Sequence, residues 1–209
     1  MEQTTSPAAD RDWARIAYWL VLATLGYNIV EAVVALWAGI SADSTALVGF
    51  GLDSIIESLA AGVLLWRVTI ESNGASRGQI QSAEHRVHRF VGYTFFALSI
   101  YILIRSILAL IHKIAPSESV VGIIIAALSL FIMPGLAMYK FRAADRLGSR
   151  ALRSEAKETL ACSYLSFTLL LGLLLNAIFG YWWADPVAAL LMVPWLVKEG
   201  FEGFEEEDE

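Results

Sequence analysis

Two pairs of side chains with metal-binding chemistry stand four residues apart in otherwise apolar sequence: Asp53 with Glu57, and Glu158 with Cys162. Residues four apart on a helix share one face, with Cβ atoms about 5–6 Å apart. Two carboxylates that close in a medium of low dielectric repel each other, so protons or a cation must bind between them. Together the pairs offer three oxygen donors and one sulfur donor, which suits a tetrahedral site of the kind that Zn²⁺ prefers, and a thiolate disfavours Mg²⁺ or Ca²⁺.

Each of these four residues also has an interpretation without a metal. Protons or the positive charge of Arg105 could neutralise Asp53 and Glu57. Cys162 could be a small apolar core residue, and Glu158 could extend from the start of its helix to the membrane interface. We predict that all four are metal ligands.

The depth of these residues argues against a single site. At 1.5 Å per residue, Asp53 and Glu57 lie about 14 and 20 Å from the outer ends of the helices, whereas Cys162 and Glu158 lie about 27 and 33 Å from them. The two pairs can share a site only if the fifth helix tilts strongly or starts further out than the second.

Three further polar residues fall inside apolar sequence: Asn28, Glu31 and Arg105. The same arithmetic places Glu31 and Arg105 at matching depths of about 10–12 Å, which predicts an ion pair, either a packing pair or one coupled to the metal site. Arg105 could instead balance Glu57. Asn28, at a depth of about 16 Å, is level with Asp53 and is expected to bond to it or to a passing ion.

A second candidate metal site precedes the third apolar stretch, where Glu84, His85 and His88 cluster. The two histidines are three residues apart, share a helix face and could chelate a transition metal. The alternative is that they are exposed side chains between Arg86 and Arg89.

The elements that must position these residues are membrane-spanning helices. Hydrophobic residues make up 57% of the 209-residue chain and charged residues only 17%, which excludes a soluble globule. Six apolar stretches are long enough, or nearly so, to cross a bilayer: 16–40, 44–66, 90–111, 120–139, 159–179 and 187–197. We predict an all-α polytopic membrane protein, with a tail over 1–15, a six-helix bundle over 16–198 and an acidic tail over 199–209.

The distribution of basic residues predicts the orientation in the membrane, and the sequence motifs indicate the class of function. Thirteen of the fifteen basic residues fall on one side of the predicted spans, so we expect both termini in the cytoplasm and a multi-pass protein of the cell (inner) membrane, surrounded by lipid. The sequence has no HExxH or GxSxG motif, and its three histidines lie at helix ends. We expect no enzyme activity, no prosthetic group and no nucleic-acid partner.

Three stretches resemble one family. Residues 28–39, 44–47 and 53–57 are similar to the first two helices of the cation diffusion facilitators, whose second helix carries two acidic ligands four apart. Residues 148–158 with Cys162 resemble the entry to their fifth helix, and 185–190 resemble the start of their sixth. The sequence around Asp53 and Glu57 also looks like a related branch of zinc-binding transmembrane proteins.

The resemblance implies export of a divalent cation by proton antiport, usually from a homodimer, with Zn²⁺ the expected ion and Cd²⁺ a second candidate. Two departures stand out. The family carries histidine or aspartate, then aspartate, where this chain has Glu158 and Cys162, and no sequence after the sixth helix matches the family's cytoplasmic metal-binding domain. The alternative is a membrane protein that binds or senses metal without transporting it.

Overall fold

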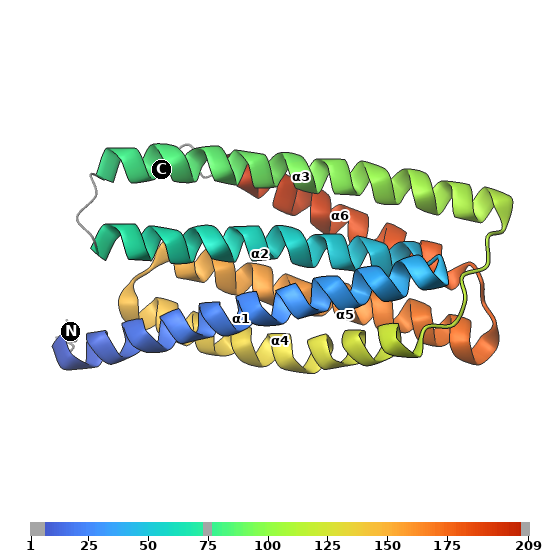
Figure 1. The fold of residues 1–209 in the computed structure, drawn as a ribbon, viewed down its shortest axis with the longest axis horizontal. Helices are drawn as coiled ribbons and strands as arrows, with labels where there is room; N and C mark the ends of the chain where they lie inside the picture. The colour runs from blue at the N-terminus through green and yellow to red at the C-terminus, as the bar shows by residue number, and fades with distance from the viewer. Residues whose placement is uncertain (1–6, 73–76, 206–209) are drawn as a thin grey trace.

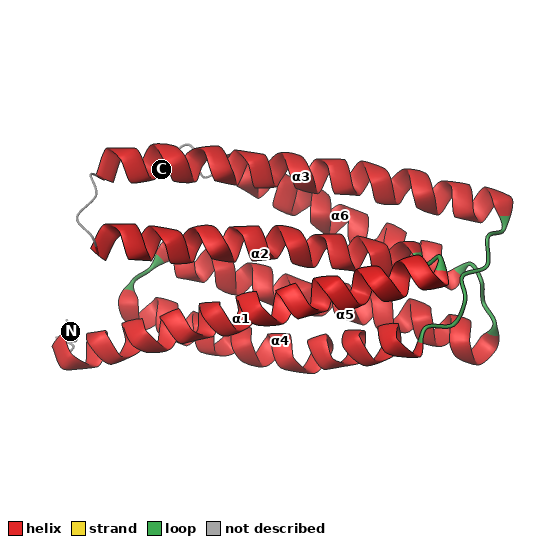
Figure 2. Cartoon of the chain, in the orientation of Figure 1, coloured by secondary structure: helices red, strands yellow, loops and turns green. Residues whose placement is uncertain are grey.

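The computed structural model describes residues 7–72 and 77–205, and side chains over 12–66 and 89–204. The described chain is all helical, with no strand (Figure 2). Its six helices, which confirm the predicted fold class, are α1 (Pro7–Ala42), α2 (Thr45–Ser72), α3 (Arg77–His112), α4 (Val120–Leu147), α5 (Arg150–Phe179) and α6 (Ala184–Glu205).

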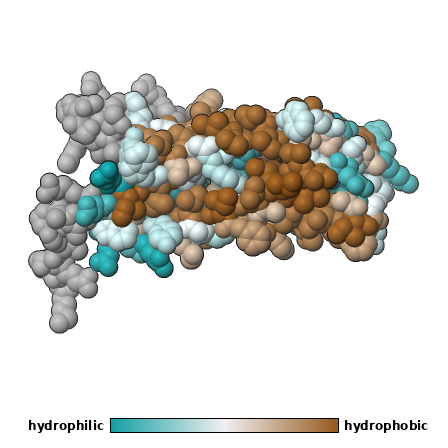
Figure 3. Space-filling model, turned by 60° about the horizontal axis from the view of Figure 1, so that its bottom comes forward, coloured by the Kyte–Doolittle hydropathy of each residue, from teal (hydrophilic) through white to brown (hydrophobic). Residues whose placement is uncertain are grey.

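Five of these helices, α1 to α5, are long and apolar enough to cross a membrane. Large apolar side chains on the outside, such as Trp37, Ile40 and Phe131, would be costly in water but suit contact with lipid. Figure 3 shows apolar surface along the middle of one face, with hydrophilic residues mostly at the two ends. The chain is therefore a multi-pass membrane protein.

The sixth helix is longer than its apolar stretch. It was expected over 187–197, but α6 begins at Ala184 and continues to Glu205, through the first part of the predicted acidic tail. Phe201 and Phe204 explain the extension, because both pack against the ring of Phe96 on α3. These aromatic contacts hold the last turns of α6 against α3.

Helix α2 has the most neighbours in the bundle, because it packs against α1, α3, α5 and α6 (Figure 1). Small residues permit the closest approaches. A Cβ atom at Gly51 would lie 2.8 Å from Cγ of Leu36 on α1, so only glycine fits there. Helix α2, which carries Asp53 and Glu57, therefore lies inside the bundle, next to helices from the start and from the end of the chain.

The start of α2 is bound to the start of α6. The carboxylate of Asp185 accepts hydrogen bonds from the backbone N–H groups of Thr45, at 2.9 Å, and Ala46, at 3.4 Å, and from the Ser44 hydroxyl. The Ser44 hydroxyl in turn accepts from the Leu47 N–H, as an N-cap does. A buried carboxylate from one helix thus satisfies the free amides that begin another.

A buried ion pair joins α4 to α5. The Lys140 ammonium lies 2.6 Å from the Glu155 carboxylate and 2.8 Å from the Thr159 hydroxyl, and the Lys140 side chain is fully buried. Lys140 is one of the thirteen basic residues that the sequence places on one side of the predicted spans. The structure instead places it in the helix interface, where its charge is compensated by a permanent partner.

Replacing Lys140 with methionine should lower the free energy of unfolding by about 3–5 kcal/mol, because the Glu155 carboxylate would be left buried without a cation. The double variant with Glu155→Leu should recover much of this loss. Thermal unfolding in detergent measures both. The matched control is Asp145→Ala, which removes an exposed ion pair with Arg153 and should cost no more than about 1 kcal/mol. Equal losses in the single variant and the control would contradict the prediction.

Candidate metal centre

Three of the four predicted ligands meet inside the bundle. Asp53 and Glu57 on α2 and Cys162 on α5 each place one ligand atom in a group whose members lie within 4.8 Å of one another. All three side chains are buried. Two carboxylate oxygens and a sulfur at this separation form a donor set suited to a borderline-soft divalent cation such as Zn²⁺ or Cd²⁺.

Cys162 reaches the depth of Asp53 and Glu57 under one of the two conditions that the depth arithmetic set, as the geometry of α5 shows. A Cβ at Gly172 would lie 2.6 Å from the Cβ of Ala188 and 3.1 Å from the Ala184 carbonyl oxygen, so Gly172 is level with the first turn of α6. Asp185 in that turn binds the start of α2. From this shared level Cys162 lies about 15 Å along α5, and Asp53 about 12 Å along α2. The last turns of α5 project beyond the start of α2 (Figure 1), which is the second of the two alternatives considered above.

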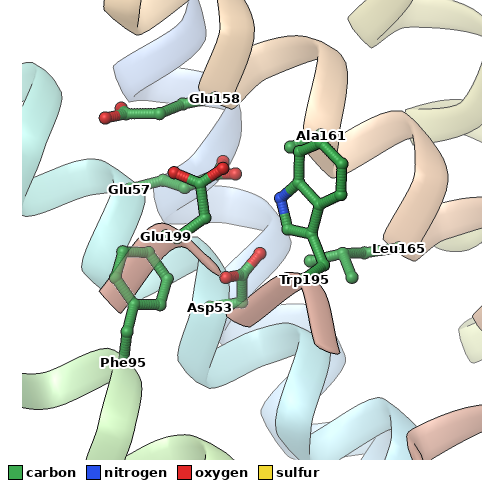
Figure 4. Close-up of a pocket in the computed structure, with 8 residues that line it drawn as sticks. All are labelled: Asp53, Glu57, Phe95, Glu158, Ala161, Leu165, Trp195 and Glu199. Carbon is green, nitrogen blue, oxygen red and sulfur yellow. The ribbon is translucent and has the colours of Figure 1, made fainter. Parts of the chain in front are cut away.

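The fourth predicted ligand, Glu158, lies beside this group rather than in it. It is half-buried and lines a pocket next to the three donors. Figure 4 shows the lining residues, which come from α2, α3, α5 and α6: Asp53, Glu57, Phe95, Glu158, Ala161, Leu165, Trp195 and Glu199. The pocket therefore continues from the three donors toward other carboxylates.

Glu199 is a site residue that sequence analysis missed. It is buried near the end of α6 and lines the pocket opposite Asp53 and Glu57. It was assigned to the acidic tail because the apolar stretch ends before it. The signal that could have placed it was the aromatic pair Phe201 and Phe204, which pack against Phe96 of α3 and extend the helix beyond its apolar stretch.

Asn28 on α1 contacts the site through Glu57. Its side-chain amide donates a hydrogen bond of 2.9 Å to the Glu57 carboxylate, rather than to Asp53 as one prediction had it. Oδ1 of Asn28 and Oδ2 of Asp53 are both buried and find no hydrogen-bond partner among the described residues. Buried oxygen atoms without partners are costly, and a cation or water would satisfy them.

Glu31 does not pair with Arg105, so that prediction was wrong. Glu31 accepts hydrogen bonds from the hydroxyls of Ser54, at 2.8 Å, and Ser129, and its carboxylate lies 3.8 Å from the Cys162 sulfur. Ser129 also shares a 2.8 Å hydrogen bond with the Tyr27 hydroxyl. The carboxylate is therefore satisfied by hydroxyls on α2 and α4 and is held against a predicted ligand.

Arg105 instead forms an ion pair with Asp43 in the turn between α1 and α2, at 2.8 Å. Equal depth did not place Arg105 beside Glu31, because α1 packs against α2 and α4 while α3 packs against α2 and α6. The pair is largely exposed, with 40% of the Arg105 side chain and 57% of the Asp43 side chain accessible. Arg105 therefore balances neither Glu31 nor Glu57.

The second predicted site, formed by Glu84, His85 and His88, lies outside the residues whose side chains the structure describes. It stays a prediction.

The cation efflux transmembrane domain, a protein family, matches residues 21–206 of this chain. The chain belongs to this family. The match covers most of the chain and confirms the resemblance to the cation diffusion facilitators, which are transporters of metal cations rather than enzymes. The chain is also similar to "Transmembrane protein 163" of Xenopus laevis, with 26% identity over 172 residues. That alignment covers 79% of this chain and 58% of the relative.

Replacing Arg105 with leucine should change the free energy of unfolding by less than about 1 kcal/mol, because its ion pair with Asp43 is exposed. Glu31→Leu should cost more, about 1–3 kcal/mol, because the buried hydroxyls of Ser54 and Ser129 lose the carboxylate as acceptor and keep only weaker bonds to neutral partners. Thermal unfolding of both variants and of their double mutant should show additive effects. A clear coupling energy between the two positions would restore the Glu31 pairing.

Proposed function

We propose that this protein exports a divalent transition-metal cation, with Zn²⁺ as the expected ion and Cd²⁺ as a second, in exchange for protons. The observation that carries the proposal is the buried group of Asp53, Glu57 and Cys162, whose ligand atoms lie within 4.8 Å of one another. Membership of the cation efflux family supports transport of a metal cation through such a site. Asp53, Glu57 and Cys162 are the proposed ligands of the transported ion.

The chemistry of the three side chains supports proton exchange. Fully ionised, they would place three negative charges within a few ångströms of one another in a low-dielectric interior, and a divalent cation compensates only two. Without a cation the group must hold protons, because like charges at this distance cannot all persist. Binding of the metal releases these protons, which couples the two movements.

The orientation in the membrane is part of the proposal. The start of α1, the end of α2, the start of α3, the end of α6 and the basic connection α4–α5 lie at one end of the bundle (Figure 1), which favours a cytoplasmic location for that end by the positive-inside rule. The proposed location is the cell (inner) membrane. A homodimer is proposed from the family resemblance.

Asp53→Ala should abolish metal transport, because it removes one ligand from the buried group. The measurement is Zn²⁺ uptake into vesicles reconstituted with the purified full chain and loaded with a fluorescent zinc indicator. Asp145→Ala is the matched control, since Asp145 is an exposed aspartate on α4 that pairs with Arg153, and it should transport at the wild-type rate. Wild-type protein that binds Zn²⁺ but moves none would support the metal-binding or sensing alternative instead.

Metal movement should be accompanied by protons moving in the opposite direction, and metal affinity should increase as pH rises, because fewer protons compete for the ligands. A pH indicator inside the same vesicles measures the first effect, with the membrane potential clamped by a potassium ionophore. Zn²⁺ titration of the purified protein at several pH values measures the second. Zn²⁺ flux without any proton movement would contradict antiport.

A further inference from the structure

The pocket beside the three donors adds two further carboxylates, one of them from α6, a helix that carries none of the three donors. Glu158 of α5 and Glu199 of α6 line it together with Asp53 and Glu57. In Figure 4 the carboxylates of Asp53, Glu57 and Glu199 all point into this pocket. Glu199 is buried, although it carries a carboxyl group that water would solvate well.

A cluster of carboxylates is not enough to define a cation site, but a separate observation points to a ligand here. Oδ2 of Asp53 is buried, lines the pocket and has no hydrogen-bond partner among the described residues. Glu199 lines the same pocket as Asp53. An orphaned buried oxygen facing another carboxylate is an arrangement that a cation stabilises and that an empty pocket does not.

The two added carboxylates of the pocket lie toward one end of the bundle. Helix α5 begins, and α6 ends, at the same end of the bundle as the start of α1 (Figure 1). Glu158 is one turn closer to that end than Cys162, and Glu199 lies in the last two turns of α6. The pocket therefore lies at the level of the three donors, and its two added carboxylates extend toward the end of the bundle that we place in the cytoplasm.

We propose that Glu199 and Glu158 bind the divalent cation in this pocket, with Asp53 and Glu57, before it reaches the sulfur of Cys162. The path of the transported ion rests on the proposed function, whereas binding in the pocket does not. Carboxylates alone are hard ligands and accept Mn²⁺ as well as Zn²⁺, whereas the thiolate favours softer ions such as Cd²⁺. The entrance pocket therefore admits divalent cations with little discrimination, and the position at Cys162 selects among them.

The test uses two probes on the purified full chain: Mn²⁺, detected by electron paramagnetic resonance, and Cd²⁺, detected by its thiolate charge-transfer absorption. Glu199→Gln should weaken Mn²⁺ binding by roughly tenfold or more and keep the Cd²⁺–thiolate absorption. Cys162→Ser should show the opposite pattern, with Mn²⁺ binding kept and the absorption lost. Glu202→Gln is the matched control, because Glu202 lies on the same helix and pairs with Lys198 at 2.5 Å, and it should behave like wild type in both assays.

Unchanged Mn²⁺ affinity in Glu199→Gln overturns this inference, and so does an equal loss in Glu202→Gln. If Glu199→Gln lowers the thermal stability, Glu158→Gln decides the question, because it removes a carboxylate from the same pocket at a half-buried position. The two proposals fail separately. Wild-type protein that transports Zn²⁺ while Glu199→Gln binds Mn²⁺ normally refutes only the entrance pocket, and wild-type protein that transports nothing refutes only the proposed function.

Discussion

The cost of placing charge inside an apolar bundle is the constraint on which this structure depends. Every buried ionisable group must hold a partner, a proton or a cation. Two regions of the bundle meet this requirement differently. Lys140 and Glu155 neutralise each other permanently across α4 and α5, whereas Asp53, Glu57 and Cys162 bring together only groups that become negative. The ion pair holds two helices together, whereas the group of three acidic side chains needs a bound cation or protons to neutralise it.

Helix α2 connects the group of three donors to the rest of the fold. It carries two of the three donors, and it packs against four of the other five helices. Its start is held by the Asp185 carboxylate of α6, which sets the depth of α2 relative to α6. Because Gly172 lets α5 approach α6 closely, Cys162 comes level with Asp53 and Glu57. The geometry of the donor group is therefore decided by contacts more than ten ångströms away from it along the helices.

The helices and the shared face of Asp53 and Glu57 could be predicted from the sequence. The predictions that failed concern contacts between helices, and they failed for one reason. Apolar length predicts the helices, and the four-residue spacing predicts that Asp53 and Glu57 share a face. Counting residues gives depth along one helix, but it gives neither the stagger between helices nor the face on which a side chain lies. For this reason it left the depth of Cys162 dependent on the stagger of α5, and it paired Glu31 with Arg105. Glu199 was missed because hydropathy ends a span at its first charges, even where aromatic packing against α3 continues the helix.

Helix α1 supplies two side chains that contact the proposed ligands. Asn28 holds Glu57 through a hydrogen bond, and Glu31 holds the sulfur of Cys162 while two serine hydroxyls hold Glu31. Outer partners of this kind orient ligands and fix which donor atom faces the ion. Since the hydroxyls come from α2 and α4, any change in the relative position of these helices alters the environment of the thiol. The ligand that departs from the family pattern is thus the one most closely tied to the packing of the bundle.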